Sequence, residues 1–136
     1  MTKQIKAFSL VEVVATMAIV GILAAVAVPV FTDKIKQARR ADGINTLAAI
    51  AVAQERYRTH NPAYGGINEV WSGVTTTPDG HYNVDLINCT ETSYTITATA
   101  AGGQSGDKQD GVACSDLKLE VTNGIVSKTP AKCWAK

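Results

Sequence analysis

One acidic side chain lies inside a long apolar stretch near the start of the chain. Phe8 to Val28 is a run of 21 residues whose only charged member is Glu12. A helix of that length spans roughly 30 Å, the thickness of the hydrocarbon core of a bilayer. An unpaired carboxylate inside such a span costs on the order of 2.5–3.5 kcal/mol. Glu12 therefore either reaches the lipid headgroups or has a cationic partner.

The sequence around the span offers no cation for Glu12. No Lys or Arg lies between Lys6 and Lys34. Cleavage of the chain between Ala7 and Phe8 would create one, the new α-ammonium group of Phe8. The lysines that precede the span predict an N-terminus in the cytoplasm and the rest of the chain on the other side of the membrane.

Patterns of catalytic residues are missing from the sequence. It has no G-x-S-x-G elbow, no H-E-x-x-H zinc motif and no phosphate-binding loop. His60 and His81 are single and have no metal-ligand spacing between them. We therefore expect no enzyme activity, no cofactor and no metal site.

Composition and cysteines narrow the remaining possibilities. The 136 residues carry 13 basic and 12 acidic side chains, so no strong field for nucleic acid or anionic lipid is implied. Cys89, Cys114 and Cys133 all lie in the second half. With an export-type N-terminus, they indicate an oxidising compartment, one disulfide and one odd thiol. The residues alone leave three single-bridge pairings open.

The helical pattern continues beyond the apolar span. We expect one helix from Phe8 to about His60, weakened locally by Pro29 and ended by Asn61-Pro62. The predicted apolar stripe of its second half consists of Ile44, Leu47, Ala48, Ala51 and Tyr57.

Two charged groups on this helix are predicted to be solvated. The basic group Lys34, Lys36, Arg39 and Arg40 is flanked by acids, which favours a solvated face just outside the membrane. Residues 54–58 are expected to form an exposed last turn, with cations near the negative helix end.

The second half of the chain alternates between loop and strand signals. Residues 62–80 predict a connecting loop anchored by Tyr64 and Trp71. Residues 81–87, 93–100, 116–121 and 125–127 read as four short antiparallel strands, the last two joined by an Asn123-Gly124 turn. Residues 102–111 are predicted to be a flexible polar loop. The fold class is α+β, a long N-terminal helix packed on a small antiparallel sheet of about four strands.

The N-terminal segment AFSLVEVVATMAIVGILAAVAVP resembles the class III signal of the type IV pilin family. The resemblance implies cleavage by a prepilin peptidase between Ala7 and Phe8 and N-methylation of Phe8. It also implies the pilin fold and a helix that first anchors the subunit in the inner membrane and later forms the core of a fibre. Ala7 stands where the family usually has Gly. In a fibre, Glu12 can pair with the Phe8 ammonium of a neighbouring subunit.

The C-terminal segment CSDLKLEVTNGIVSKTPAKCW resembles minor pilins similar to those that prime type IV pili. In those proteins a disulfide closes the last loop and a Trp follows the second Cys. The resemblance therefore implies a Cys114–Cys133 disulfide, with Cys89 buried and free.

These features predict four regions. They are a cleaved leader at 1–7, an apolar transmembrane and assembly helix at 8–31, an amphipathic half-helix at 32–61, and a β-rich head at 62–136. The leading hypothesis is a structural subunit of a type IV pilus, with size and tail favouring a minor pilin, for adhesion, twitching motility or DNA uptake. Expected partners are other pilin subunits, prepilin peptidase and the inner-membrane assembly machinery. The subunit is expected in the bacterial inner membrane and then in the extracellular pilus, with its head periplasmic or extracellular.

Two alternatives remain at this point. A pseudopilin of type II secretion ranks second, because no acidic cluster suited to calcium is visible. A DNA-binding receptor pilin of natural transformation would need a basic strip on the head, and interspersed acids make DNA a possible but not favoured partner. The residues that could supply this strip are Arg56, Arg58, Lys108, Lys118, Lys128, Lys132 and Lys136.

Overall fold

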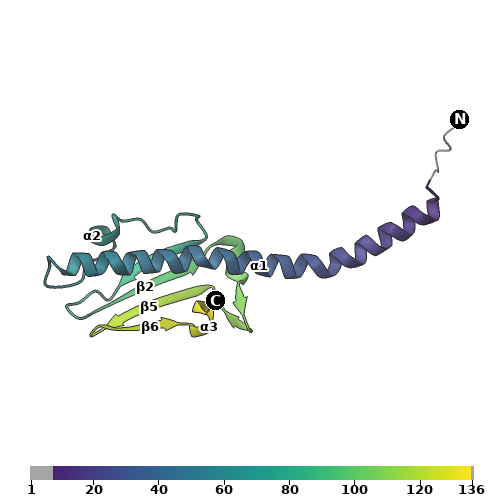
Figure 1. Ribbon diagram of the computed structural model, residues 1–136. Helices are drawn as coiled ribbons and strands as arrows, with labels where there is room; N and C mark the ends of the chain where they lie inside the picture. Colours follow the sequence, from purple (N-terminus) through teal and green to yellow (C-terminus); the bar gives the residue numbers. More distant parts are fainter. Residues whose placement is uncertain (1–7, 136) are drawn as a thin grey trace, which may run out of the picture. The chain divides into compact units, whose positions relative to one another are not determined.

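The computed structural model describes residues 8–135 of the chain (Figure 1). The predicted leader, including Ala7, lies outside the described residues. The chain divides into two compact units, one up to Lys34 and one from Ile35 onward, and we describe each by itself. The helix α1, Leu10–Arg58, contributes to both units.

The end of α1 matches the predicted stop before Pro62. The helix ends at Arg58, and the following turn uses local side chains as partners for the last carbonyl groups. The Asn61 amide donates to the Tyr57 carbonyl oxygen at 2.8 Å, and the Arg58 guanidinium donates to the Asn61 carbonyl oxygen at 2.7 Å. The first bond reaches one of the last carbonyl groups of the helix, which have no partner within it, and the second holds the turn that follows.

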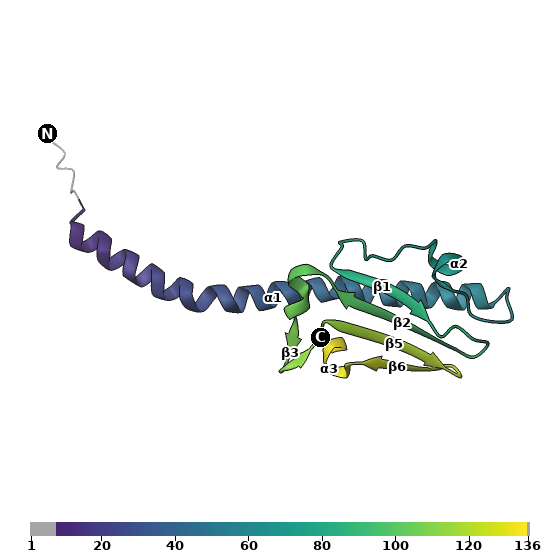
Figure 2. The same cartoon turned by 180° about the vertical axis from the view of Figure 1, so that it is seen from behind.

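The second unit contains a four-stranded antiparallel sheet in the order β1-β2-β5-β6 (Figure 2). The strands are β1 Tyr82–Ile87, β2 Ser93–Ala100, β5 Asp116–Thr122 and β6 Ile125–Thr129. Asn123 and Gly124 both have positive φ, at 52° and 78°, as a two-residue type I′ hairpin turn requires. The four predicted strands and the predicted turn are confirmed.

The second half of α1 covers one face of this sheet. Leu47 and Ile50 are fully buried and belong to the same apolar cluster as Tyr82, Ile96 and Leu117 from the strands. This packing confirms the α+β fold class, but the predicted stripe is partly wrong because Ala48 is exposed. The buried positions of α1 instead recur every three or four residues, with one adjacent pair, and they are Arg40, Gly43, Thr46, Leu47, Ile50 and Gln54.

Gln54 corrects the prediction of an exposed last turn. Its side chain is buried, because its amide nitrogen donates to the Gly65 carbonyl oxygen at 2.6 Å and its amide oxygen accepts from the Gly65 amide at 3.1 Å. The pair of bonds satisfies both ends of the amide and so allows its burial. It also fixes the connecting segment against α1.

The connecting segment after α1 contains a short helix, α2 Ile67–Trp71, that the sequence did not predict. Tyr64 and Trp71 are the expected anchors and both pack against the core. Tyr64 meets the ring of Tyr94 edge to face, with 4.6 Å between the ring centroids.

Residues 102–111 are not a flexible loop, and this prediction was wrong. They form the 3₁₀ helix η1, Gly102–Gly106, and the strand β3, Lys108–Gln109, which pairs with β4, Val112–Ala113. Gln104 and Asp107 are buried in this segment. The chain then ends in the short helix α3, Ala131–Trp134.

Candidate assembly helix and nucleic-acid interface

The apolar half of α1 is exposed along its length within the first unit. Phe8 is 80% exposed, and all the large apolar side chains of residues 8–31 are exposed as well. Among the described residues this helix is the one long and apolar enough to cross a membrane. Such a surface requires a lipid or protein environment, because contiguous exposed apolar area is rare on soluble monomers.

Glu12 lies in the first turn of α1, where its carboxylate is favourably placed beside the positive helix end. Its backbone amide donates to the Ser9 carbonyl oxygen at 3.0 Å, which continues the helical turn back toward Phe8. The predicted cleavage and methylation involve Ala7, outside the described residues, and Phe8, just before the helix. Cleavage, methylation and the pairing of Glu12 all remain predictions.

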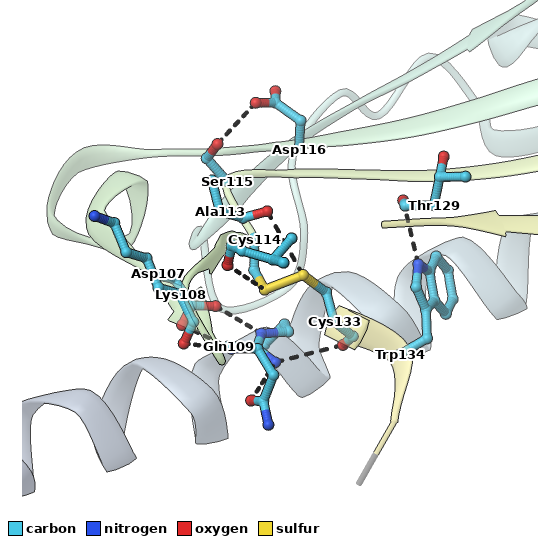
Figure 3. Close-up of a disulfide and its surroundings, with 12 residues drawn as sticks. Asp107, Lys108, Gln109, Ala113, Cys114, Ser115, Asp116, Thr129, Cys133 and Trp134 are labelled. Atoms are coloured by element: carbon cyan, nitrogen blue, oxygen red, sulfur yellow. Dashed lines mark hydrogen bonds and ion pairs between the residues drawn. A yellow bond between two sulfur atoms is a disulfide. The ribbon is translucent and has the colours of Figure 1, made fainter. Parts of the chain in front are cut away.

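The C-terminal disulfide joins Cys114 to Cys133, as the resemblance implied (Figure 3). The two Cα atoms are 5.7 Å apart, and both residues are buried. Cys89 is the free cysteine, as predicted, but it is half-buried and not buried as expected. Burial raises the pKa of its thiol above the ordinary value, so Cys89 is a poor nucleophile near neutral pH.

Arg40 corrects the prediction of a fully solvated basic face. Its side chain is buried against Asp107, and the residues are 2% and 1% exposed. The guanidinium Nε donates to Asp107 Oδ2 at 2.7 Å, and Nη2 donates to Oδ1 at 2.8 Å. This hydrogen-bonded pair raises the pKa of Arg40 further, so the guanidinium is charged at every pH of interest.

The remaining donors of Arg40 reach two other segments. Nη1 donates to Gln109 Oε1 at 3.1 Å and to the Cys133 carbonyl oxygen at 3.5 Å, and Nη2 reaches the Lys108 carbonyl oxygen at 3.5 Å. One side chain of α1 thus bonds to both β3 and α3. The disulfide in Figure 3 joins α3 to Cys114, which directly follows β4.

Three of the seven basic residues proposed for a DNA-binding strip lie on elements that contact one another. Lys108 lies in β3, Lys128 in β6 and Lys132 in α3, and α3 contacts both of these strands. The Lys128 ammonium lies 5.1 Å from the centroid of the Trp134 ring, whose Nε1 donates to the Thr129 carbonyl oxygen at 3.3 Å. The β3/β6/α3 surface, defined by these lysines and Trp134, therefore combines cations with an aromatic ring.

The other basic residues of the proposed strip do not join this surface. Lys118 pairs with Glu120 at 2.7 Å on the exposed face of the sheet. Arg58 lies 5.9 Å from the centroid of the Tyr64 ring at the end of α1. Arg56 belongs to the same last turn, and Lys136 lies outside the described residues. The one acid in the turn between β3 and β4 is Asp110, which is exposed.

The described residues contain no cluster of metal-ligating side chains. No group of three or more His, Cys, Asp or Glu side chains there could hold a metal ion. What the arrangement offers chemically is an apolar helix for association and a small cationic, aromatic surface for an anionic partner.

An exposed apolar N-terminal helix and a disulfide-closed head, in which a helix covers a four-stranded antiparallel sheet, define a pilin-like subunit. A family model described as "Type IV minor pilin ComP, DNA uptake sequence receptor" matches residues 29–118. A second model, "Prokaryotic N-terminal methylation motif", matches residues 2–28. The chain belongs to the type IV pilin family that the first model describes.

Curated relatives agree with this assignment. The fimbrial protein EcpC of Eikenella corrodens is 31% identical over 101 residues, which cover 73% of this chain and 65% of the relative. A fimbrial protein of Dichelobacter nodosus is 33% identical over 104 residues, covering 76% and 63%. The type IV major fimbrial protein FimA of Dichelobacter nodosus is 32% identical over 120 residues, covering 88% and 66%. The chain therefore spans slightly less than two thirds of the length of these relatives.

Proposed function

We propose that this chain is a minor pilin that assembles into a type IV pilus through the apolar half of α1 and binds DNA with its head. The observation that carries the proposal is the family match over residues 29–118, which includes α1 from Pro29 onward and most of the head. That family is described both as a minor pilin and as a receptor for DNA uptake sequences. Net charge alone did not favour DNA as a partner. The family match is the reason to prefer a DNA-binding role over a purely structural one.

The assembly step follows from the charges at the N-terminus. Cleavage after Ala7 by prepilin peptidase, followed by N-methylation, would leave a cationic amine on Phe8. In the inner membrane this end lies close to the headgroups. In a fibre it enters an apolar core, where an unpaired charge costs about 3–5 kcal/mol. Glu12 of a neighbouring pilin would neutralise it, which sets the axial register and selects for cleaved subunits.

Processing is tested by mass spectrometry of the pilus fraction. We expect a chain that begins at Phe8 and carries one extra methyl group. An uncleaved chain in assembled fibres would contradict the proposed maturation.

The role of Glu12 is tested by comparing subunit in membranes with subunit in sheared pili. Glu12→Val should insert and be cleaved normally, because it removes a charge from the span, but should be depleted from fibres. Glu12→Asp should be intermediate, because its carboxylate is one methylene shorter. Thr16→Val, one turn further along α1, is the matched control and should assemble normally. Normal incorporation of Glu12→Val would mean that the carboxylate only reaches the headgroups.

The DNA-binding role is tested with the full chain in detergent micelles and a labelled duplex. Since three lysines of the β3/β6/α3 surface are available for phosphates, we expect the logarithm of the affinity to fall with the logarithm of salt at a slope of about −2 to −3. Fragments of the producing bacterium's own genome should be retained above shuffled duplexes of equal composition. Equal retention of genomic and shuffled duplexes would mean that the head binds DNA without sequence specificity. No retention of either duplex at low salt would mean that the pilin is purely structural.

A further inference from the structure

We propose that Arg40 is a positioning residue for DNA binding: from its buried place on α1 it sets the spacing of Lys108 and Lys132. The inference rests on the proposed DNA-binding function of the head. It concerns a residue that does not touch DNA itself.

The two lysines belong to segments that cannot hold their own geometry. β3 has two residues and α3 has four, and elements this short gain little from their own hydrogen bonds. The disulfide ties α3 to the residue that follows β4, not to β3. β3 is joined to that residue through its pairing with β4 and through the Cys114 amide, which donates to the Asp107 carbonyl oxygen at 2.9 Å. A side-chain contact to both β3 and α3 would fix their spacing further.

Arg40 supplies that contact from a single planar group. The guanidinium reaches the carbonyl oxygen of Lys108 itself and the carbonyl oxygen of Cys133, the residue after Lys132, each at 3.5 Å. Its two short bonds to Asp107, the residue before Lys108, hold this planar set of N–H donors, here called the guanidinium fork, in place. Because the guanidinium is planar and its donors are fixed relative to one another, it imposes a geometry that a lysine ammonium does not.

Arg40 is excluded as a phosphate contact by its own surroundings. It is 2% exposed, and its charge is balanced by the Asp107 carboxylate. Lys36, on the preceding turn of α1, donates to the Gly106 carbonyl oxygen at 3.4 Å and so also holds the segment that leads into β3. The charge that reaches solvent at this surface therefore comes from the lysines, and Arg40 acts only through their placement.

The test measures the affinity of the full chain in detergent micelles for one duplex across a salt series. Arg40→Lys keeps the net charge but loses the fork. If the lysines no longer act together, about one phosphate contact is lost, so affinity near 0.1 M salt should fall roughly eightfold and the salt slope should shrink by about 1. Arg56→Lys, the same exchange in the exposed last turn of α1, is the matched control and should change neither quantity.

Asp107→Asn separates positioning from charge. It adds one positive charge, so a purely electrostatic role for Arg40 would make binding tighter and the salt slope steeper. Positioning demands the opposite, weaker binding with a shallower slope, because the anchor of the fork is lost. Tryptophan fluorescence and the intact disulfide report whether each variant is folded.

The outcomes are distinct. The inference is supported if the wild-type chain binds the duplex and both variants, Arg40→Lys and Asp107→Asn, bind it more weakly with a shallower salt slope. The inference is overturned, and the proposed function is left intact, if the wild-type chain binds but Arg40→Lys has an unchanged affinity or Asp107→Asn has a higher one. Unfolding of both variants would mean that the contact maintains the head as a whole, which also overturns it. Absence of wild-type binding removes the proposed function together with this inference.

Discussion

Removing one partner of the Arg40–Asp107 pair should destabilise the head far more than removing both. In Asp107→Leu the guanidinium would stay buried and lose its 2.7 and 2.8 Å bonds, keeping only acceptors at 3.1–3.5 Å. In Arg40→Met the Asp107 carboxylate, 1% exposed, would lose its cation. Each change leaves an uncompensated charge inside the protein, at a cost of about 3–5 kcal/mol.

The double variant Arg40→Met/Asp107→Leu should recover most of that loss. It removes both charges and their desolvation cost, and apolar side chains of similar size fill the site. Replacement of a whole buried ion pair in this way is commonly neutral, or stabilising by about 1–4 kcal/mol. A single variant, by contrast, would consume a large part of an ordinary domain stability of about 5–15 kcal/mol.

The assay is urea unfolding of the full chain in detergent micelles, followed by tryptophan fluorescence. Trp71 and Trp134, the two tryptophans of the sequence, both belong to the head and are half-buried, so the signal reports unfolding of the head. The Lys118–Glu120 pair is the matched control, because it has the same 2.7 Å separation but its side chains are 45% and 42% exposed. Its single variants to Gln should cost at most about 1 kcal/mol.

Two results would refute this reasoning. Single variants at Arg40 and Asp107 that cost no more than those of the exposed pair would mean that water reaches the site in solution. A double variant as unstable as the sum of its singles would mean that the hydrogen bonds to β3 and α3, not the burial of charge, dominate the stability.

Three further predictions follow from the packing of the head. Cys133→Ser removes the disulfide to Cys114, which links residues 19 positions apart in the sequence. The chain-entropy estimate predicts that this change lowers the free energy of unfolding by about 3 kcal/mol, as measured by urea unfolding under oxidising conditions. Gly65→Ala should cost about 1–3 kcal/mol, because its Cβ would lie 2.8 Å from a tyrosine ring carbon, whereas Gly103→Ala, with nothing within 4 Å, should be neutral. Burial raises the pKa of Tyr94 in the folded head, so the unfolded chain ionises first and stability should fall as pH rises above about 10; Tyr94→Phe should reduce that fall.

Local periodicity was sufficient to predict most of the architecture. The strand that became β1 alternates buried and exposed residues along its whole length, and the Asn123-Gly124 turn fixed the β5–β6 register. Both signals come from neighbouring residues, which is why they were readable in the sequence. The prediction that Ala48 belongs to the buried stripe was wrong, because alanine is found in both buried and exposed positions. Packing against the sheet determines which side of α1 is buried.

The polar segment at 102–111 could not be predicted by the same means. Its glycines and polar residues are typical of flexible loops, and locally that interpretation is sound. Asp107 is held in place by its bond to Arg40, which lies 67 residues earlier in the sequence. A contact at that separation leaves no local periodicity, and Arg40 in turn looked like one of several solvated cations on a helix face.

Arg40 and Glu12 show the limit of reading a charge from its neighbours in sequence. Glu12 is conspicuous in the sequence because everything around it is apolar, whereas Arg40 is not, because basic and acidic residues surround it. The free energy of each charge depends on where its counter-charge lies, and neither counter-charge is local. Arg40 has its partner within the chain, inside the head. For Glu12 we propose a partner on another subunit, which a single chain does not contain. Sequence context therefore indicates how costly an unpaired charge is, and only the folded or assembled state shows how that cost is met.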